Sequence, residues 1–385
     1  MNINDYIKKY SNYSFSIKPF NEVDSLILAE LSYVNLYLCN KFPDSSFCIK
    51  DIPLYLLNDK KVYARSVDAK HNRIMLNLMF NSIRYKDIII KDIKEVFDKE
   101  RITQFMAVTL ILPNNTMYIS FRGTDTSLLG WREDFLMLIK ETIPSQDLAL
   151  EYTLKALKEN DCNFILGGHS KGGNLAFYSA FMLPKEFHSR FIKAYSFDGP
   201  GFRKGLEQFE NKDLVMDKLI KYRTHRDFVG FFLNNMETYK VVASNGILLG
   251  GHDPFWWKVD NKGEGFVYKS AITKGAYKTA NKYIKWLDTL SNDDIALAID
   301  AFYSVFYKCD EIYDLFRNVV PRVIRRKKTL KKYSDEERIK IKEIYGRLFK
   351  FLRSNRNIDK YFKQIDKKGK NKDDDTSVKG VKGNK

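Results

Sequence analysis

The chain has 385 residues, 44% of them hydrophobic, with 28 Phe and 23 Tyr, so it is long and apolar enough to bury a sizeable core. Its formal net charge is +17, and no uncharged apolar stretch of 18 or more residues occurs, which excludes a readable transmembrane helix. The polar N-terminus lacks the apolar region of a signal peptide, and the four cysteines have neither C-x-x-C nor zinc-ligand spacing. We therefore expect a cytoplasmic protein with reduced thiols and no zinc site.

Helices and strands are predicted in alternation along the first half of the chain. Residues 20–40 predict a helix, and residues 104–123 predict two strands joined by a turn at 113–116. Two amphipathic helices are then expected over 127–139 and 149–160, and the second leads into the short β-favouring run "NFIL".

The second half continues the alternation without an internal repeat. It predicts a strand, a helix, another strand and a final strand pair, over 191–199, 204–219, 220–227, 239–245 and 246–253. Residues 292–320 predict an amphipathic helical cap or C-terminal layer. Strands that alternate with helices favour a mainly parallel, doubly wound α/β sheet with flanking helices.

The stretch "GGHSKGGNLA" (167–176) lies where a strand is expected to become a helix. Gly168, Ser170 and Gly172 match G-x-S-x-G, the nucleophile elbow, which places the serine on a strained turn with its hydroxyl above the sheet edge. A Cβ at either glycine would collide with the neighbouring strand and helix. The alternative is a glycine-rich turn with an incidental serine, but the strand–turn–helix context favours the elbow.

A serine nucleophile on this architecture is followed along the chain by an acid and then by a histidine base. Of the five histidines, His71 precedes the serine, His169 adjoins it, and two others lie in a polar segment and in a predicted strand. His252, in the glycine-flanked stretch "LLGGHDPFWW", is the expected base. The alternative role for His252 is packing against Trp256 or Trp257.

The orienting acid has two candidates. Asp227 ends the strand before the histidine and is preferred, while Asp198, in "YSFDGPGF", ends the preceding strand and is the main rival. Asp253 adjoins the histidine and can hardly face its ring. The "DGPGFRKG" stretch is one residue out of register with the G-x-G-x-x-G loop that binds dinucleotides, and the chain has no acidic residue at the right distance from it. No dinucleotide cofactor is therefore expected.

An oxyanion hole requires two backbone N–H donors. One is expected from Lys171, the residue after the nucleophile, and the other from Thr124 in the "FRGTD" turn, with its hydroxyl as an extra donor. Asp134, ten residues on, is expected to hold that threonine. The alternative for "FRGTD" is an ordinary polar turn.

These motifs together resemble a known family. "FRGT", a Trp-containing helix with an Asp, and G-H-S-x-G-G-x-L-A are similar to the class 3 lipase branch of the α/β-hydrolases. More closely, "FNEVDSLILAELSY", "FRGTD…GWREDF", "GGHSKGGNLA", "FDGPGF" and "HDPFWW" look like the bacterial Mbeg1-like family, a domain of unknown function (DUF2974), from about residue 15 to 315.

The resemblance implies an α/β-hydrolase fold with Ser170 as nucleophile, His252 as base, and Thr124 and Lys171 as oxyanion donors. Asp227 aligns with the lipase acid by order alone. The family has no firmly assigned substrate, and the basic C-terminal part of the chain lies outside the resemblance.

Residues 321–385 hold 23 Lys and Arg against 9 Asp and Glu, a surplus of 14, which leaves +3 for the rest of the chain. We expect a hydrolase domain over 15–320, a basic helical extension over 321–366 and a disordered tail over 367–385. Ser334 and Glu337 predict a helix-capping box in the extension. The extension is either a solvated segment or a weak contact for anionic membrane lipid; no motif supports nucleic-acid binding.

The sequence therefore predicts a serine esterase of the lipase type that uses no metal or organic cofactor and acts on medium-chain acyl esters or lysolipids. The rival is a hydrolase-fold binding or scaffold protein without turnover. Apolar side chains that either border the site or pack in the core are Leu128, Leu129, Trp131, Phe135, Leu136, Leu138, Phe255, Trp256 and Trp257.

Overall fold

The computed structural model describes residues 1–39, 46–227, 230, 232–233, 238–246, 249–305 and 330–353. Among these, nine strands form one sheet in which spatial neighbours follow one another along the chain. The strands from β4 to β8 are parallel, and the outer strands β1–β3 and β9 pair antiparallel. The strands are β1 (Phe47–Cys48), β2 (Ile89–Asp98), β3 (Thr103–Ile111), β4 (Met117–Phe121), β5 (Phe164–His169), β6 (Phe191–Phe197), β7 (Leu219–Thr224), β8 (Lys240–Val242) and β9 (Tyr268–Lys269).

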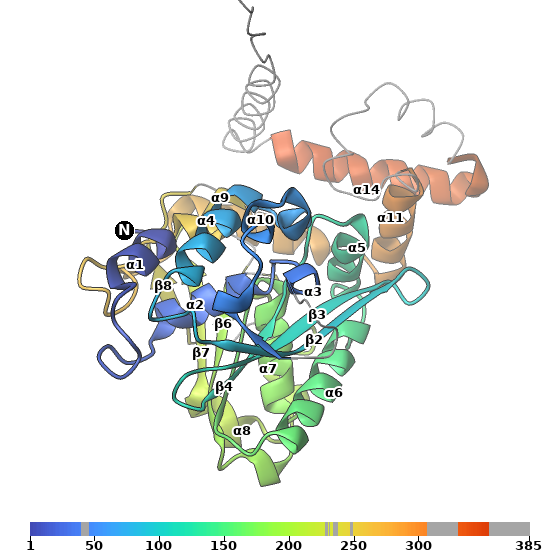
Figure 1. Ribbon diagram of the computed structural model, residues 1–385. Helices are drawn as coiled ribbons and strands as arrows, with labels where there is room; N and C mark the ends of the chain where they lie inside the picture. Colours follow the sequence, from blue (N-terminus) through green and yellow to red (C-terminus); the bar gives the residue numbers. More distant parts are fainter. Residues whose placement is uncertain are drawn as a thin grey trace, which may run out of the picture.

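Helices cover both faces of this sheet (Figure 1). The described helices are α1 (Ile3–Tyr10), α2 (Glu22–Leu31), α3 (Leu36–Cys39), α4 (Ala69–Phe80), α5 (Leu128–Leu136), α6 (Pro144–Glu159), α7 (Lys171–Phe181), α8 (Lys212–Val215), α9 (Leu249–His252), α10 (Lys274–Leu287), α11 (Asn292–Val305) and α14 (Asp335–Arg353).

Successive side chains along each strand point to opposite faces of the sheet, so the sheet separates two hydrophobic cores. Tyr118 and Ile165 pack with α1, α2 and α4, whereas Ile119 and Leu166 pack with α6 and α7. Because consecutive parallel strands are neighbours, the crossover helices α6, α7 and α8 lie on one face, and the N-terminal helices fill the other.

Most predicted elements are present, with three differences. The single helix expected over 20–40 forms two helices, α2 and α3, and the helix expected over 292–320 is described as α11 as far as Val305, with 306–320 outside the described residues. The hairpin over 104–123 is confirmed as β3 and β4. The helix expected over 204–219 is wrong: only α8 and short 3₁₀ turns form there, and Gly205 has a left-handed φ of 71°. The strand expected over 246–253 is also wrong, because the chain folds back on itself and a Cβ at Gly246 would overlap the carbonyl group of Gly250.

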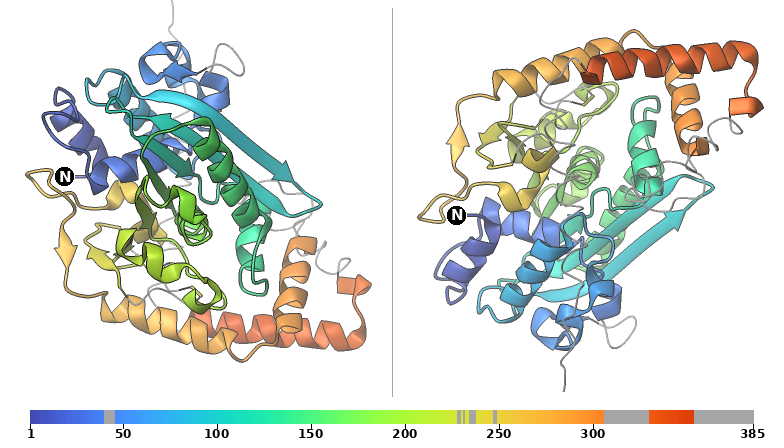
Figure 2. Two further views of the ribbon diagram at one scale, coloured as in Figure 1. Left: turned by 90° about the horizontal axis from the view of Figure 1, so that it is seen from below. Right: turned by 90° about the horizontal axis from the view of Figure 1, so that it is seen from above.

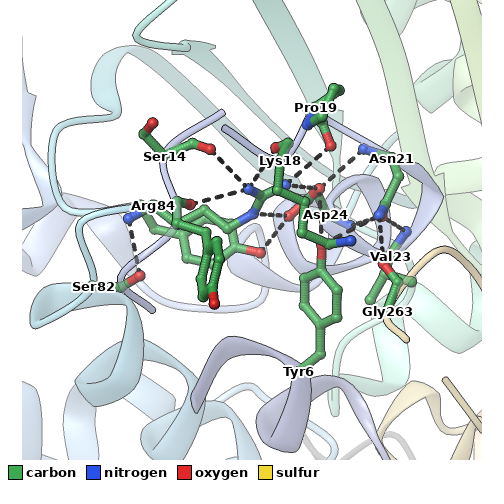
Figure 3. A network of polar contacts seen from close by, with 12 residues as sticks. Tyr6, Ser14, Lys18, Pro19, Asn21, Val23, Asp24, Ser82, Arg84 and Gly263 are labelled. Carbon is green, nitrogen blue, oxygen red and sulfur yellow. Dashed lines mark hydrogen bonds and ion pairs between the residues drawn. The ribbon is translucent and has the colours of Figure 1, made fainter. Parts of the chain in front are cut away.

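A buried ion pair ties the N-terminal segment to the loop between α4 and β2 (Figure 3). Arg84 binds Asp24 of α2 through two hydrogen bonds of 2.7 and 2.6 Å, and both side chains are fully buried. The same guanidinium donates to the main-chain carbonyl of Lys18 at 2.8 Å, and Tyr85 donates to Asp24 at 2.5 Å. Since Tyr6 of α1 also contacts Asp24, the core begins before residue 15, where the sequence analysis placed its start.

The basic extension is partly folded onto the body. The Ser334–Glu337 capping box is confirmed, with Glu337 N–H donating to Ser334 Oγ at 3.1 Å. Tyr345 of α14 donates to the Ala298 carbonyl of α11 at 2.8 Å, and Figure 2 shows α14 running across the end of α11. The predicted tail over 367–385 and most of the basic run before Leu330 lie outside the described residues.

No helix in the described ranges combines the length and the apolar character needed to cross a membrane.

Candidate active site

Ser170 lies between β5 and α7 in a strained backbone conformation. Its φ is 58° and its ψ is −130°, which is rare for a residue with a side chain. Serine at a helix N-cap commonly accepts a hydrogen bond from the first turn, but Ser170 Oγ forms no such cap. The main chain is instead held by a hydrogen bond of 2.9 Å from Ser170 N–H to the Phe197 carbonyl. The turn therefore leaves the serine hydroxyl available for chemistry.

The two glycines of the motif are required by close backbone approach, as predicted. A Cβ at Gly168 would lie 2.7 Å from the Phe121 carbonyl oxygen and closer still to the backbone of Gly172. A Cβ at Gly172 would overlap the same Phe121 carbonyl. The elbow thus packs directly on the neighbouring strand β4.

His252, in the single turn α9, is brought to this elbow. Its ring centroid lies 4.6 Å from that of His169, the residue before the serine. Its Nδ1 is 3.0 Å from Asp198 Oδ2 and 3.4 Å from Asp227 Oδ2, and both carboxylates are buried. Among the described residues no hydrogen bond joins Ser170 to His252 in this conformation.

The order of these residues along the chain fits the predicted α/β-hydrolase fold, which is confirmed. Ser170 follows β5, Asp198 and Asp227 follow β6 and β7, and His252 follows β8. The carboxyl ends of successive parallel strands meet at one edge of the sheet, which brings the serine, the two carboxylates and the histidine together.

Both acid candidates reach the same ring nitrogen. The hydrogen bond of 3.0 Å is made by Asp198, the rival in the sequence analysis, and Asp227 lies slightly farther away. Asp198 follows β6 directly with a φ of 54°, and its N–H donates to the Tyr222 carbonyl at 2.8 Å. The strained turn therefore aims Asp198 at His252.

The electrostatics of this trio are strongly coupled. Burial alone would lower the pKa of His252, but its hydrogen bonds to Asp198 and Asp227 outweigh burial and raise the pKa to about 10. Burial and the neighbouring Asp227 raise the pKa of Asp198 to about 7. Within the described ranges these three side chains are also the group whose atoms lie close enough to hold a metal ion. The Nδ1 atom of His252, however, is already engaged in the hydrogen bond with Asp198.

The "FRGTD" turn packs against the elbow. A Cβ at Gly123 would lie 3.2 Å from Ser170 Cβ, so the next N–H, that of Thr124, lies beside the nucleophile. Neither the Thr124 nor the Lys171 N–H donates to another group in the described part of the chain. The Thr124 hydroxyl donates to Asp134 at 2.5 Å, as expected, and burial raises the pKa of Asp134 to about 6. The hydroxyl is therefore already engaged, and the backbone N–H is the donor that stays free.

The Lys171 side chain forms a buried anchor that the sequence analysis missed. Lys171 Nζ lies 2.7 Å from Glu133 Oε2 of α5 and donates to the Gln104 carbonyl at 2.8 Å. Ser145 donates to the other oxygen of Glu133 at 2.5 Å. This network joins the helix after the nucleophile to the helix after the oxyanion turn. The sequence signal on one side is Lys171, a charged residue at the start of a helix that is buried throughout.

The apolar side chains expected to border the site mostly pack in cores. Phe255 and Trp257 are buried with the N-terminal helices, and Trp256 is 39% exposed. Leu128 and Phe135 of α5 pack on Tyr303 of α11. Two cavities of about 590 and 530 Å³ are present, and neither Ser170 nor His252 lines them. Neither of these two cavities is therefore a candidate acyl pocket.

A model of the Mbeg1-like family matches residues 79–304. No curated protein matches the sequence. Among solved structures, the chain is similar to M37 lipase at 16% identity, covering 54% of this chain and 67% of that one with a TM-score of 0.35. It is similar to the Rhizomucor miehei lipase in its propeptide complex at 15% identity; the match covers 70% of this chain and 72% of the lipase, with a TM-score of 0.36. It is also similar to a triacylglycerol lipase from Penicillium expansum at 14% identity; the match covers 48% of this chain and 80% of the lipase, with a TM-score of 0.28.

Proposed function

The chain belongs to the Mbeg1-like family, and from the geometry of its elbow we propose that it is a serine hydrolase that cleaves acyl esters through an acyl-enzyme. One observation carries this proposal. Ser170 is held in a strained turn with its hydroxyl uncommitted, beside a histidine whose Nδ1 is held by two buried carboxylates. Strain of this kind persists where the surrounding structure enforces it, and it is common at reactive centres.

The proposed reaction follows from these positions. Ser170 Oγ attacks the ester carbonyl carbon while His252 Nε2 takes its proton, and the oxyanion accepts hydrogen bonds from the Thr124 and Lys171 N–H groups. His252 then gives the proton to the leaving alkoxide, and the acyl group stays on Ser170. Water, deprotonated by His252, attacks the acyl-enzyme and releases the carboxylic acid. No cofactor is required in this scheme.

We assign Asp198 as the main orienting acid and Asp227 as a second carboxylate that supports the same imidazole. The shorter distance to His252 Nδ1 supports this order. This assignment reverses the preference drawn from the sequence, where position along the chain was the sole criterion.

The pH dependence of the reaction should report this trio. His252 acts as a base when neutral, and its pKa of about 10 means that the neutral fraction grows as the pH rises from 7 toward 10. We expect the rate of fluorophosphonate labelling to rise over this range. In Asp198→Asn one carboxylate charge is lost, so the pKa of His252 falls by about 1–3 units and the rising limb moves to lower pH.

The labelling rate is measured against pH for wild type, Asp198→Asn and Asp227→Asn. Identical profiles for all three proteins would contradict the shared role of the carboxylates.

The pH dependence of folding stability gives a second check. A histidine with a raised folded-state pKa stabilises the fold fully below about pH 6.5, and this contribution is lost as the pH rises through about 10.

The substrate class is proposed as medium-chain acyl esters or lysolipids. The support is the fold and the apolar α5 segment beside the oxyanion turn, of which Leu129 is partly exposed. The test is hydrolysis of p-nitrophenyl acetate, butyrate and octanoate by the full chain. We expect turnover that increases from acetate to octanoate. Turnover restricted to acetate would remove the lipid assignment, and no turnover of any ester would favour a hydrolase-fold binding protein.

We also propose a cytoplasmic location with weak attraction to anionic membrane through the basic extension. Basic residues near an anionic surface contribute about 1 kcal/mol each. Replacement of Arg325, Arg326, Lys327 and Lys328 by Gln should lower the partition of the full chain onto phosphatidylserine vesicles by tenfold or more at low salt. These positions precede α14, and the substitutions change none of the described residues that pack α14 on α11. Equal co-sedimentation of both proteins would show that the run merely solubilises the chain.

A further inference from the structure

A buried carboxylate near the C-terminal end of α2 lies next to the residue that precedes Ser170 in the elbow. Glu30 is 4% exposed, and its Oε1 lies 3.1 Å from His169 Nδ1. The other nitrogen of that ring, Nε2, lies 3.0 Å from the main-chain carbonyl oxygen of His252. Glu30, His169 and the backbone of the proposed base thus form one continuous chain of contacts.

The position of each proton in this series of contacts follows from which atoms can donate a hydrogen bond and which can only accept one. A carbonyl oxygen accepts but cannot donate, so His169 Nε2 must carry a hydrogen. Burial and the nearby His252 hold the pKa of His169 well below its usual value, so the ring is neutral and Nδ1 is an acceptor. An ionised Glu30 would also be an acceptor, and its buried Oε1 would then face a lone pair without any hydrogen bond.

We propose that Glu30 is a positioning residue that stays protonated and donates a hydrogen bond to His169 Nδ1, which fixes His169 and, through it, the main chain that carries His252. This inference rests on the proposed function for its consequence in catalysis. A protonated carboxyl satisfies both partners with one hydrogen. Burial raises the pKa of Glu30 to about 8, in agreement with a neutral acid at pH 7.

Other groups around Glu30 support the neutral form. Tyr33, at 3.5 Å from His169 Nδ1, is the competing donor, but its distance is at the limit for a hydrogen bond. The charged and titratable groups around Glu30 and its partners in the described part of the chain are Tyr33, Asp68, Arg122, Asp134, His169, Asp227, His252 and Asp253. Asp68 and Asp253 oppose ionisation of Glu30, and His252 favours it.

Two substitutions at position 30 test whether the role of this side chain is to donate a hydrogen bond. Glu30→Gln keeps an N–H donor of similar size, whereas Glu30→Leu removes the donor. We expect Glu30→Gln to label at the wild-type rate at pH 7 and faster than wild type above pH 8, where Glu30 of wild type loses its proton while the neutral fraction of His252 still grows in both proteins. We expect Glu30→Leu to label about tenfold more slowly or worse, because His169 Nδ1 is left without a partner. Tyr33→Phe removes the competing hydroxyl, which also contacts the Gly123 main chain of the oxyanion turn, and should slow labelling less than Glu30→Leu does.

The protonation state is measured directly by infrared difference spectroscopy of wild type minus Glu30→Gln at pH 7, and folding of each variant is checked by thermal melting. We expect the carbonyl stretch of a protonated carboxylic acid in wild type. Its absence, equal slowing in Gln and Leu variants that fold, or a larger loss in Tyr33→Phe would overturn the proposal. If wild type shows the band but never reacts with the fluorophosphonate, the proposed function fails while the protonated Glu30 stands.

Discussion

Ser170→Ala should lower kcat/KM for p-nitrophenyl octanoate by about 10⁴- to 10⁶-fold, the loss typical of removing a serine nucleophile. The substitution removes the atom that forms the acyl-enzyme, while His252 and the oxyanion donors are left in place. Alanine is no harder to fit than serine in the turn, since both have a Cβ at the strained φ of 58°. The loss is therefore expected without a comparable loss of stability.

Ser179→Ala is the matched control for that experiment. Ser179 lies in the same helix α7, is fully buried, and its hydroxyl has no hydrogen-bond partner in the described part of the chain. The same chemical change there should leave kcat/KM within about twofold of wild type. Similar activity of the Ser170 variant and this control would mean that another residue performs the reaction.

Arg84→Met should lower the free energy of unfolding by about 3–5 kcal/mol, because it leaves the carboxylate of Asp24 buried and unpaired. It also leaves the loop carbonyl of Lys18 without its donor (Figure 3). The measurement is chemical denaturation. The effect should be large because the pair is fully buried and the guanidinium makes two hydrogen bonds to one carboxylate.

Lys94→Met tests whether loss of any ion pair has this effect. Lys94 lies 2.9 Å from Glu151, but both side chains are substantially exposed. Solvent screens such a pair, so its removal should change the unfolding free energy by less than about 1 kcal/mol. A small effect of Arg84→Met, equal to that of Lys94→Met, would contradict the anchoring role of the Arg84–Asp24 pair.

The elbow could be predicted from the sequence because its determinants are local. Gly168, Ser170 and Gly172 lie within five residues, and the clashes that require glycine arise wherever a strand turns sharply into a helix. The link from Thr124 to Asp134 was predictable for a similar reason, since a turn and the helix that follows it span ten residues.

The choice of acid could not be made from the sequence. Asp198 and Asp227 each follow a strand, and their distances to His252 depend on how the ends of β6 and β7 are placed relative to α9. The single turn at α9 was itself missed, because "GILLGGHD" has a β-favouring start and its reversal depends on contact between Gly246 and Gly250.

Glu30 and the Lys171–Glu133 pair were missed for a different reason. Helical periodicity separates buried from exposed positions, but it does not say which buried charge meets which partner. Glu30 meets a residue 139 positions away, on another element. The available signal is a charge on the apolar face of a helix, which marks a polar contact without naming the partner.

The central claim is that Ser170 is a reactive nucleophile, and the most direct measurement is mass mapping of the full chain after treatment with a fluorophosphonate. We predict one phosphonyl adduct per molecule, located on the peptide that contains Ser170, and faster adduct formation at pH 9 than at pH 7. No adduct on folded protein, or an adduct on another residue with Ser170 unmodified, would contradict the account.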